Sequence, residues 1–115
     1  MKRGEIWWAE LAAPRGSEPG YRRPLVIVQA DGFNRSGIHT VIGVALSTNM
    51  LLAEMPGNVS ITADASGLPE DSIANVTQII TIDKRFLEER AGSLPRGVMR
   101  EIDAGLMLVL SLADV

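Results

Sequence analysis

The sequence contains no cysteine and only one histidine, His39. Without cysteine there is no disulfide, no thiolate nucleophile and no cysteine-type zinc site, a composition that is consistent with a reducing cytoplasm. One histidine also excludes a histidine-based metal cluster and a two-histidine ribonuclease site within one chain. We therefore predict a cytoplasmic protein whose chemistry uses no metal and no other cofactor.

Long hydrophobic runs are also absent. No segment has the roughly 18 to 20 consecutive apolar residues that cross a bilayer, and no apolar stretch with a cleavage site follows the N-terminus. The sequence thus predicts neither a membrane span nor a signal peptide. Its 115 residues, 46% of them hydrophobic, suffice for one domain over residues 1–115 with one core, and are too few for two.

Positive charge is scarce, since the net charge is −3 at pH 7. Proteins that hold nucleic acid through many phosphate contacts are more often basic, because each neutralised phosphate releases counterions. The charge therefore argues against extended, tight binding to RNA. A local basic patch stays open because Arg15, Arg22, Arg23 and Arg35 are close in sequence, although solvated surface is the favoured interpretation of their spacing alone.

Short strand-like segments dominate the first two thirds of the chain. Runs and alternations of apolar, β-favouring residues predict five strands, at residues 4–11, 24–29, 40–47, 58–62 and 72–82. Prolines and glycines predict a long loop over residues 12–22, and that length is typical of a functional loop. Turns are predicted at residues 31–34 and 67–71.

Helix signals occur near the C-terminus. Asp83 resembles the N-cap of a short helix over residues 84–90 that Gly92 ends. Pro95 suits the first turn of a second helix. Apolar residues recur there at spacings of three and four, at Val98, Ile102, Leu106, Val109 and Leu110. We expect a mostly β protein with α-helix, in which about five strands curl into a small barrel that the C-terminal helix closes.

Arg23, Ser47 and Thr48 are the polar residues best placed for phosphate chemistry. Arg23 lies between a loop and a rigid strand, and Pro24 restricts it to extended conformations. Its planar guanidinium can donate two hydrogen bonds to a phosphate, but a strand-edge charge is an equal interpretation. Ser47 and Thr48 end a strand, where hydroxyl groups more commonly satisfy turn backbone.

The remaining candidates are weaker. Trp7 and Trp8 point to opposite faces of a strand, so one is expected in the core and the other is free to stack on a base or a partner subunit. His39 precedes a strand without an acidic neighbour, which favours a surface role. The acidic pairs at residues 70–71 and 88–89 lack the spacing of a metal-binding loop, so solvated surface is favoured for both.

Several ordered motifs together resemble the MazF/PemK (Kid) family of toxin endoribonucleases. They are Arg-Gly-Glu-Ile-Trp at 3–7, Gly-Ser-Glu-Pro-Gly-Tyr-Arg-Arg-Pro at 16–24, Leu-Val-Ile-Val-Gln-Ala-Asp-Gly-Phe-Asn at 25–34, Ala-Leu-Ser-Thr at 45–48, Gly-Leu-Pro-Glu-Asp-Ser at 67–72 and Gln-Ile-Ile-Thr-Ile-Asp-Lys at 78–84. Their order and intervals span nearly the whole chain, so the resemblance is specific in a way that no single motif would be.

The resemblance implies an SH3-like barrel of the PemK/CcdB type and a homodimer. It also implies sequence-specific cleavage of single-stranded RNA, as by an mRNA interferase, to 2′,3′-cyclic phosphate and 5′-hydroxyl ends, and neutralisation by a cognate antitoxin whose acidic tail covers the RNA groove. The catalytic residues fall on Arg23 and on Ser47, where many members have threonine. RNA-binding positions fall on Glu18, Gln29, Asn34, Thr48 and Gln78.

Two positions depart from the family pattern, and some questions stay open. Pro19 replaces a common glutamine and Ala30 a common asparagine, changes that bear on sequence preference. The general base is unassigned because arginine stays protonated in proteins; Glu18 is a candidate. The alternatives are a non-enzymatic, CcdB-like toxin that binds DNA gyrase through its C-terminal tail, residues 110–115, and a catalytically dead relative kept as a structural partner.

Overall fold

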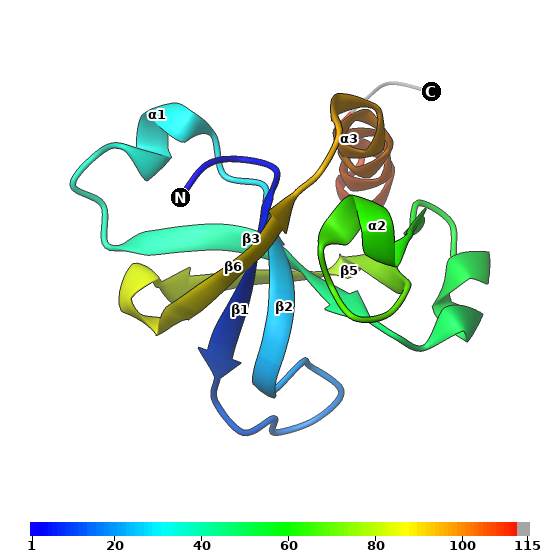
Figure 1. Ribbon diagram of the computed structural model, residues 1–115, viewed down its shortest axis with the longest axis horizontal. Coiled ribbons are helices and arrows are strands. Elements are labelled where there is room, and N and C mark those ends of the chain that lie inside the picture. The colour runs from blue at the N-terminus through cyan, green and yellow to red at the C-terminus, as the bar shows by residue number, and fades with distance from the viewer. Residues whose placement is uncertain (113–115) are drawn as a thin grey trace.

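One antiparallel sheet with the strand order β4-β5-β3-β2-β1-β6 forms the body of the computed structural model, which describes residues 1–112 (Figure 1). In chain order the elements are β1 (Glu5–Leu11), β2 (Tyr21–Ile27), α1 (Asp31–Asn34), β3 (Thr40–Ser47), η1 (Met50–Glu54), β4 (Val59–Ile61), α2 (Ala63–Ser66), β5 (Ser72–Asp83), η2 (Lys84–Phe86), β6 (Leu87–Ser93) and α3 (Arg96–Leu110). The expected mostly β architecture with a C-terminal helix is therefore confirmed.

The sheet curls into a half-barrel whose two edges come together. α2 follows the edge strand β4 and packs on β6, the strand at the opposite edge. The contact is between backbones: a Cβ at Gly92 of β6 would overlap the carbonyl group of Ser66, and one at Gly67 would overlap that of Ala91. Gly67 also ends α2 with a φ of 78°, a left-handed conformation that glycine adopts without strain.

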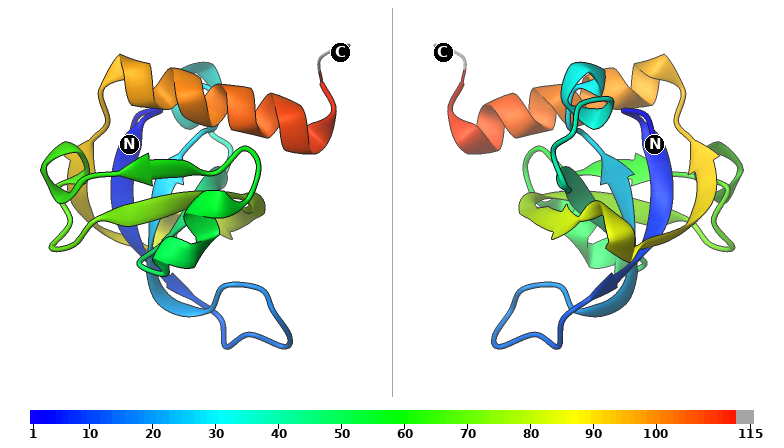
Figure 2. Two further views of the ribbon diagram at one scale, coloured as in Figure 1. Left: turned by 90° about the vertical axis from the view of Figure 1, so that its right-hand side faces the viewer. Right: turned by 90° about the vertical axis from the view of Figure 1, so that its left-hand side faces the viewer.

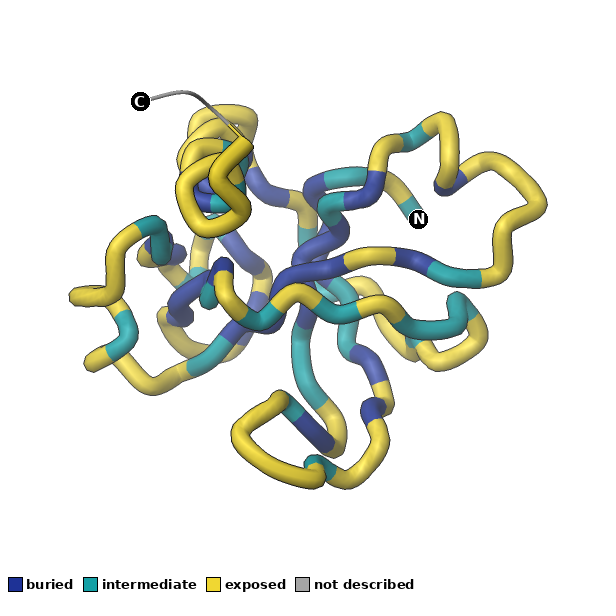
Figure 3. Tube along the Cα trace, turned by 180° about the vertical axis from the view of Figure 1, so that it is seen from behind, coloured by how far each residue is buried: buried dark blue, intermediate teal, exposed yellow. Residues whose placement is uncertain are grey.

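The core lies between the curled sheet and α3, which crosses one open side of it (Figure 2). Met99 and Ile102 of α3 are buried against the inner face of the sheet, and the helix approaches the Gly57 backbone so closely that a Cβ at Gly105 would overlap its carbonyl oxygen. Exposed residues gather in the connections, including the loop of residues 12–20 (Figure 3).

A second apolar cluster lies on the other face of the sheet. Its buried members are Ala9, Leu11, Leu25 and Ala45. Successive strand residues point to opposite faces, so Val26 and Val44 belong to the inner core while their neighbours belong to this second cluster. Within residues 1–112, no helix is both long enough and apolar enough to cross a membrane.

The predicted helix over residues 84–90 is wrong. Asp83 does cap a turn, since its side chain accepts a hydrogen bond from the Arg85 N–H, but that turn is the three-residue η2. The chain then continues as β6, which pairs with β1 and adds a sixth strand. A short isolated helix is marginal, whereas β6 satisfies its backbone on the free edge of β1.

Other boundaries shift by a few residues. β3 has the predicted bounds, but β2 begins at Tyr21 and ends at Ile27, so Arg23 lies within the strand. The predicted turn at residues 31–34 is the four-residue α1, and α2 was not predicted. Pro95 is the N-cap of α3, one residue before the first turn.

Candidate active site

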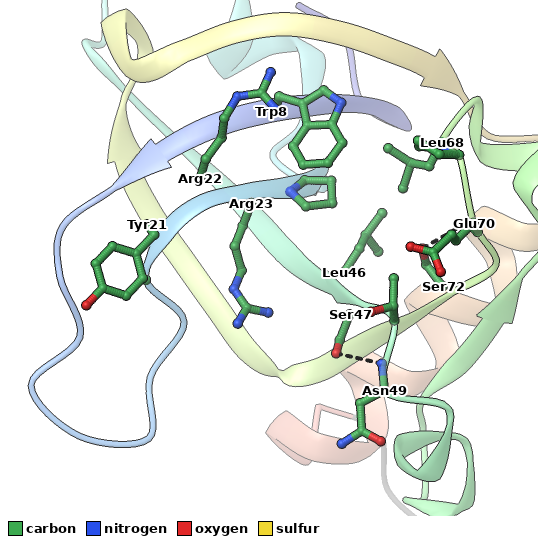
Figure 4. A pocket seen from close by; sticks show the side chains of 14 residues that line it. Trp8, Tyr21, Arg22, Arg23, Leu46, Ser47, Asn49, Leu68, Glu70 and Ser72 are labelled. Carbon is green, nitrogen blue, oxygen red and sulfur yellow. Dashed lines mark hydrogen bonds between the residues drawn. The ribbon is translucent and has the colours of Figure 1, made fainter.

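Arg23 and Ser47 come together through the pairing of β2 with β3. The register places Leu25 opposite Ala45 on the face of the second apolar cluster. Arg23 lies two residues before Leu25, and Ser47 lies two residues after Ala45, so in an antiparallel pair both continue the same cross-strand row. Both side chains are half-buried, and the close-up shows them beside the same hollow (Figure 4).

The Ser47 hydroxyl serves the turn that follows β3 and still has a hydrogen to donate. Its Oγ accepts a hydrogen bond from the Asn49 N–H at 3.1 Å, as expected for a hydroxyl at a strand end. A hydroxyl can accept and donate together, and the hydrogen bond to Asn49 uses only an acceptor lone pair. Ser47 is thus oriented by the backbone, with its O–H available for a ligand.

Two adjoining pockets share Arg23 and Ser47 as lining residues. The larger, about 510 Å³, also has Trp8, Thr48 and Glu70 in its walls; we call it the Trp8 pocket. The smaller, about 190 Å³, is lined in addition by Glu18 and Gln78; we call it the Glu18 pocket. The structure therefore brings five predicted site residues to one place, namely Glu18, Arg23, Ser47, Thr48 and Gln78.

Glu18 is an exposed carboxylate whose pKa is lowered by its own loop. N–H groups of Glu18 itself, of Arg15 and of Gly16 lower the pKa of its carboxyl group, although the side chain is exposed. Hydrogen bonds to the charged form stabilise that form. Glu18 is therefore ionised near neutral pH and able to accept a proton, but its low pKa makes it a weak base.

Known proteins resemble this chain both in sequence and in fold. Residues 2–110 match the family described as "PemK-like, MazF-like toxin of type II toxin-antitoxin system". The chain belongs to this family. It is 46% identical over 112 residues to endoribonuclease MazF6 of Mycobacterium tuberculosis, with 97% of this chain and 98% of that protein covered. It is 35% identical to endoribonuclease EndoA of Bacillus subtilis, with coverage of 99% and 97%.

Solved structures of related toxins have the same fold. An endoribonuclease in complex with its cognate antitoxin, from a mycobacterial species, superimposes with a TM-score of 0.80 at 23% identity, covering 100% of this chain and 99% of that one. MazF from Deinococcus radiodurans gives 0.80 at 18% identity, with 96% of each chain covered. At these identities the likeness shows the fold alone.

Gln29 and Asn34 of this PemK/MazF-family chain do not lie at the site with Arg23. Both side chains are buried. Gln29 Nε2 donates to Asn34 Oδ1 at 3.0 Å and to the Thr40 carbonyl at 3.2 Å, while Asn34 Nδ2 donates to the Gln29 carbonyl at 2.9 Å. Their amides thus hold α1 against the start of β3 and line neither pocket. The expectation that they contact RNA receives no support from this placement.

The four arginines that are close in sequence do not form one patch. Arg22 and Arg23 line the Trp8 pocket, whereas Arg15 lines a separate hollow beside Leu11 and Phe86. Arg35 follows α1, which lies at the far end of the sheet from the loop of residues 12–20 (Figure 1). Their separation corrects the idea of a single basic cluster.

Two features of the Trp8 pocket were not anticipated. Arg22 stacks over Trp8, with its guanidinium carbon 4.4 Å from the ring centroid. Glu70 is exposed, as expected, and it also lies in the wall of this pocket. The only sequence signal for the first was the prediction that one of the two tryptophans is free to stack. Residues 1–112 contain no group of three or more His, Cys, Asp or Glu side chains placed to hold a metal.

Proposed function

We propose that this toxin endoribonuclease of the PemK/MazF family cleaves single-stranded RNA at short sequence motifs without a metal, with Arg23 and Ser47 as its catalytic residues. The observation that carries the proposal is their convergence. Two residues from separate strands line the same two pockets, and both can donate hydrogen bonds to a phosphate.

The reaction is a transesterification. The 2′-oxygen forms a bond to phosphorus, the bond from phosphorus to the 5′-oxygen breaks, and the products carry a 2′,3′-cyclic phosphate and a 5′-hydroxyl. Charge grows on the equatorial oxygens of the phosphate, where Arg23 and the Ser47 O–H donate hydrogen bonds. One proton leaves the 2′-hydroxyl for a general base, and the leaving 5′-oxygen takes another from a water molecule. Glu18 is the proposed acceptor of the first, because it lines the Glu18 pocket with both catalytic residues.

RNA-binding roles fall on the other residues of the two pockets. Gln78 offers an amide from β5, and Thr48 offers an exposed hydroxyl after β3. The loop that carries Glu18 also lines the Glu18 pocket, through Ser17 and Pro19. Gln29 and Asn34 are left out of the proposed contacts because their amides are bonded internally.

The test is cleavage of RNA in excess EDTA, with the new ends identified by mass spectrometry. We expect 2′,3′-cyclic phosphate and 5′-hydroxyl ends, and loss of cleavage in Arg23→Ala. Arg35→Ala removes an exposed arginine outside the site and is expected to cleave like the wild type. Other ends, or full activity in Arg23→Ala, would contradict the mechanism.

The proposed partners are a second copy of the chain and a cognate antitoxin. Exposed apolar residues at the end of α3, namely Met107, Leu108, Leu110 and Leu112, offer a surface for dimerisation. A related mycobacterial endoribonuclease was solved with its cognate antitoxin. We expect an SH3-like barrel acting in the cytoplasm on RNA.

A non-enzymatic toxin that binds DNA gyrase is not favoured, because the curated relatives are named endoribonucleases. That alternative depended on the tail at residues 110–115, of which residues 113–115 lie outside the described residues. The dead-relative alternative is opposed by the intact arginine and hydroxyl at positions 23 and 47.

A further inference from the structure

The Trp8 pocket is lined by apolar and acidic residues that binding of a phosphate alone does not require. Arg23 and Ser47 occupy one side of it, while Glu70 and Ser72 lie across the hollow (Figure 4). Apolar groups fill the walls between them, from Trp8, Pro24, Leu46 and Leu68. At about 510 Å³ it has the size and the mixed lining of a pocket for a small organic group.

The indole ring of Trp8 and the planar guanidinium of Arg22 lie together at one wall of this pocket. The Arg22 guanidinium covers Trp8 at 4.4 Å, and its Nε donates to Glu88 Oε1 at 2.9 Å. The Arg22 guanidinium is therefore positioned by both the Trp8 ring and the Glu88 carboxylate. Nearly half of the Arg22 side chain, 46%, is still exposed. Unpaired RNA bases stack on aromatic rings and on arginine planes of this kind.

Tyr21 also lines the Trp8 pocket, but its ring points away from Trp8 and from the hollow (Figure 4). The side chain is 64% exposed, and its backbone φ of 60° is unusual for a residue with a bulky side chain. Such strain is retained where the surrounding structure or a function maintains it. The Tyr21 ring therefore lies outside the stack that Arg22 forms on Trp8 (Figure 4).

Glu70 is unexpected in a pocket for an anionic substrate. Its carboxylate makes no hydrogen bond and no ion pair within residues 1–112, and it repels a phosphodiester. A carboxylate is an acceptor only, so the favourable ligand group is an N–H donor. Among the parts of RNA, the amino and ring N–H groups of the bases supply such donors.

We propose that the Trp8 pocket binds a nucleobase next to the scissile phosphate, and that Glu70 selects bases that present an amino group. This inference rests on the proposed ribonuclease function. Adenine, cytosine and guanine each offer an amino group on the Watson–Crick edge. Uracil offers only one ring N–H between two carbonyl oxygens, which repel the carboxylate. Arg22 and Trp8 supply the stacking, and Glu70 supplies the discrimination.

The experiment compares base preferences on one RNA pool. RNA with a randomised segment is cleaved by the wild type, by Glu70→Gln and by Glu101→Gln, and the new ends are sequenced to give a relative kcat/KM for each base at each flanking position. Glu101 is exposed on α3, so its variant carries the same charge change outside the pocket. Circular dichroism checks that all three proteins are folded.

We expect the wild type to disfavour uracil at one position beside the cleaved bond. Loss of a well-placed base contact reduces discrimination by about tenfold, so Glu70→Gln is expected to lose that preference at this position only. Glu101→Gln is expected to match the wild type.

A uniform rise in rate for all bases in Glu70→Gln would overturn the inference, because it would make Glu70 a source of repulsion alone. An unchanged profile, or a wild type without bias against uracil beside the cut, would also overturn it. Failure of the proposed function has a different result, which is no cleavage, or cleavage that Arg23→Ala retains.

Discussion

The Ser47 Oγ atom accepts the backbone N–H of Asn49 at 3.1 Å, so the turn after β3 orients the hydroxyl that faces the proposed phosphate site. Orientation by the backbone is useful because a fixed donor needs no reorganisation as charge grows on the phosphate. The same contact links the stability of the turn to the geometry of the site.

Ser47→Ala is expected to lower kcat on the order of 10²-fold, the usual cost of removing one fixed donor to a developing oxyanion. It also removes the acceptor for Asn49, at a cost of about 1 kcal/mol in the free energy of unfolding. Ser47→Thr keeps the hydroxyl and is expected to keep most activity. Single-turnover cleavage and urea unfolding measure the two effects, and equal kcat in Ala and Thr variants would remove Ser47 from the mechanism.

Gly92→Ala is expected to destabilise the fold, because the new Cβ would overlap the Ser66 carbonyl group where α2 meets β6. Overpacking of this kind costs about 1 to 3 kcal/mol. Gly37→Ala is the matched control, since nothing lies within 4 Å of the position of its Cβ. Urea unfolding of both variants tests whether the contact between α2 and β6 contributes to stability, and equal midpoints would show that it does not.

Asp31→Asn is expected to remove part of the dependence of stability on pH. The N–H of Arg3 donates to Asp31 Oδ1 at 2.7 Å, and this bond, with help from Asn34, holds the pKa of Asp31 below its usual 3.8. A carboxyl group whose pKa is lower in the folded state than in the unfolded state stabilises the fold. This stability is fully present above the pKa of the unfolded state and is lost as the pH falls through the pKa of the folded state.

The difference in unfolding free energy between wild type and Asp31→Asn should therefore be present at pH 7 and shrink below about pH 4. Urea titrations across this range measure it, with Glu101→Gln as an exposed control. A difference that is constant with pH would show that the carboxylate charge does not contribute.

Leu108→Glu is expected to dissociate the proposed dimer into monomers. Leu108 is 57% exposed on α3, and a carboxylate there would be buried without a partner in a dimer interface. Ser60→Glu places the same charge on an exposed position of β4 and is expected to stay dimeric. Light scattering after size-exclusion chromatography measures the molar mass of both variants. A dimeric Leu108→Glu would show that the end of α3 is not the dimer interface.

The sequence by itself determined the elements whose signals are local. Apolar runs in β3 and the helical spacing of Ile102 and its neighbours in α3 predict strand and helix because each pattern matches one backbone period. The Arg23–Pro24 step and the hydroxyl at Ser47 were likewise visible as residues suited to phosphate chemistry.

Only the tertiary structure decided how these pieces combine. β6 formed a strand because β1 offered it a free edge, which no local signal within residues 84–93 shows. Glutamine and asparagine amides can bind RNA, but the buried amides of Gln29 and Asn34 form hydrogen bonds within the protein instead. The meeting of Arg23 and Ser47 depends on strand register, since a slip by one residue would turn either side chain to the opposite face of the sheet.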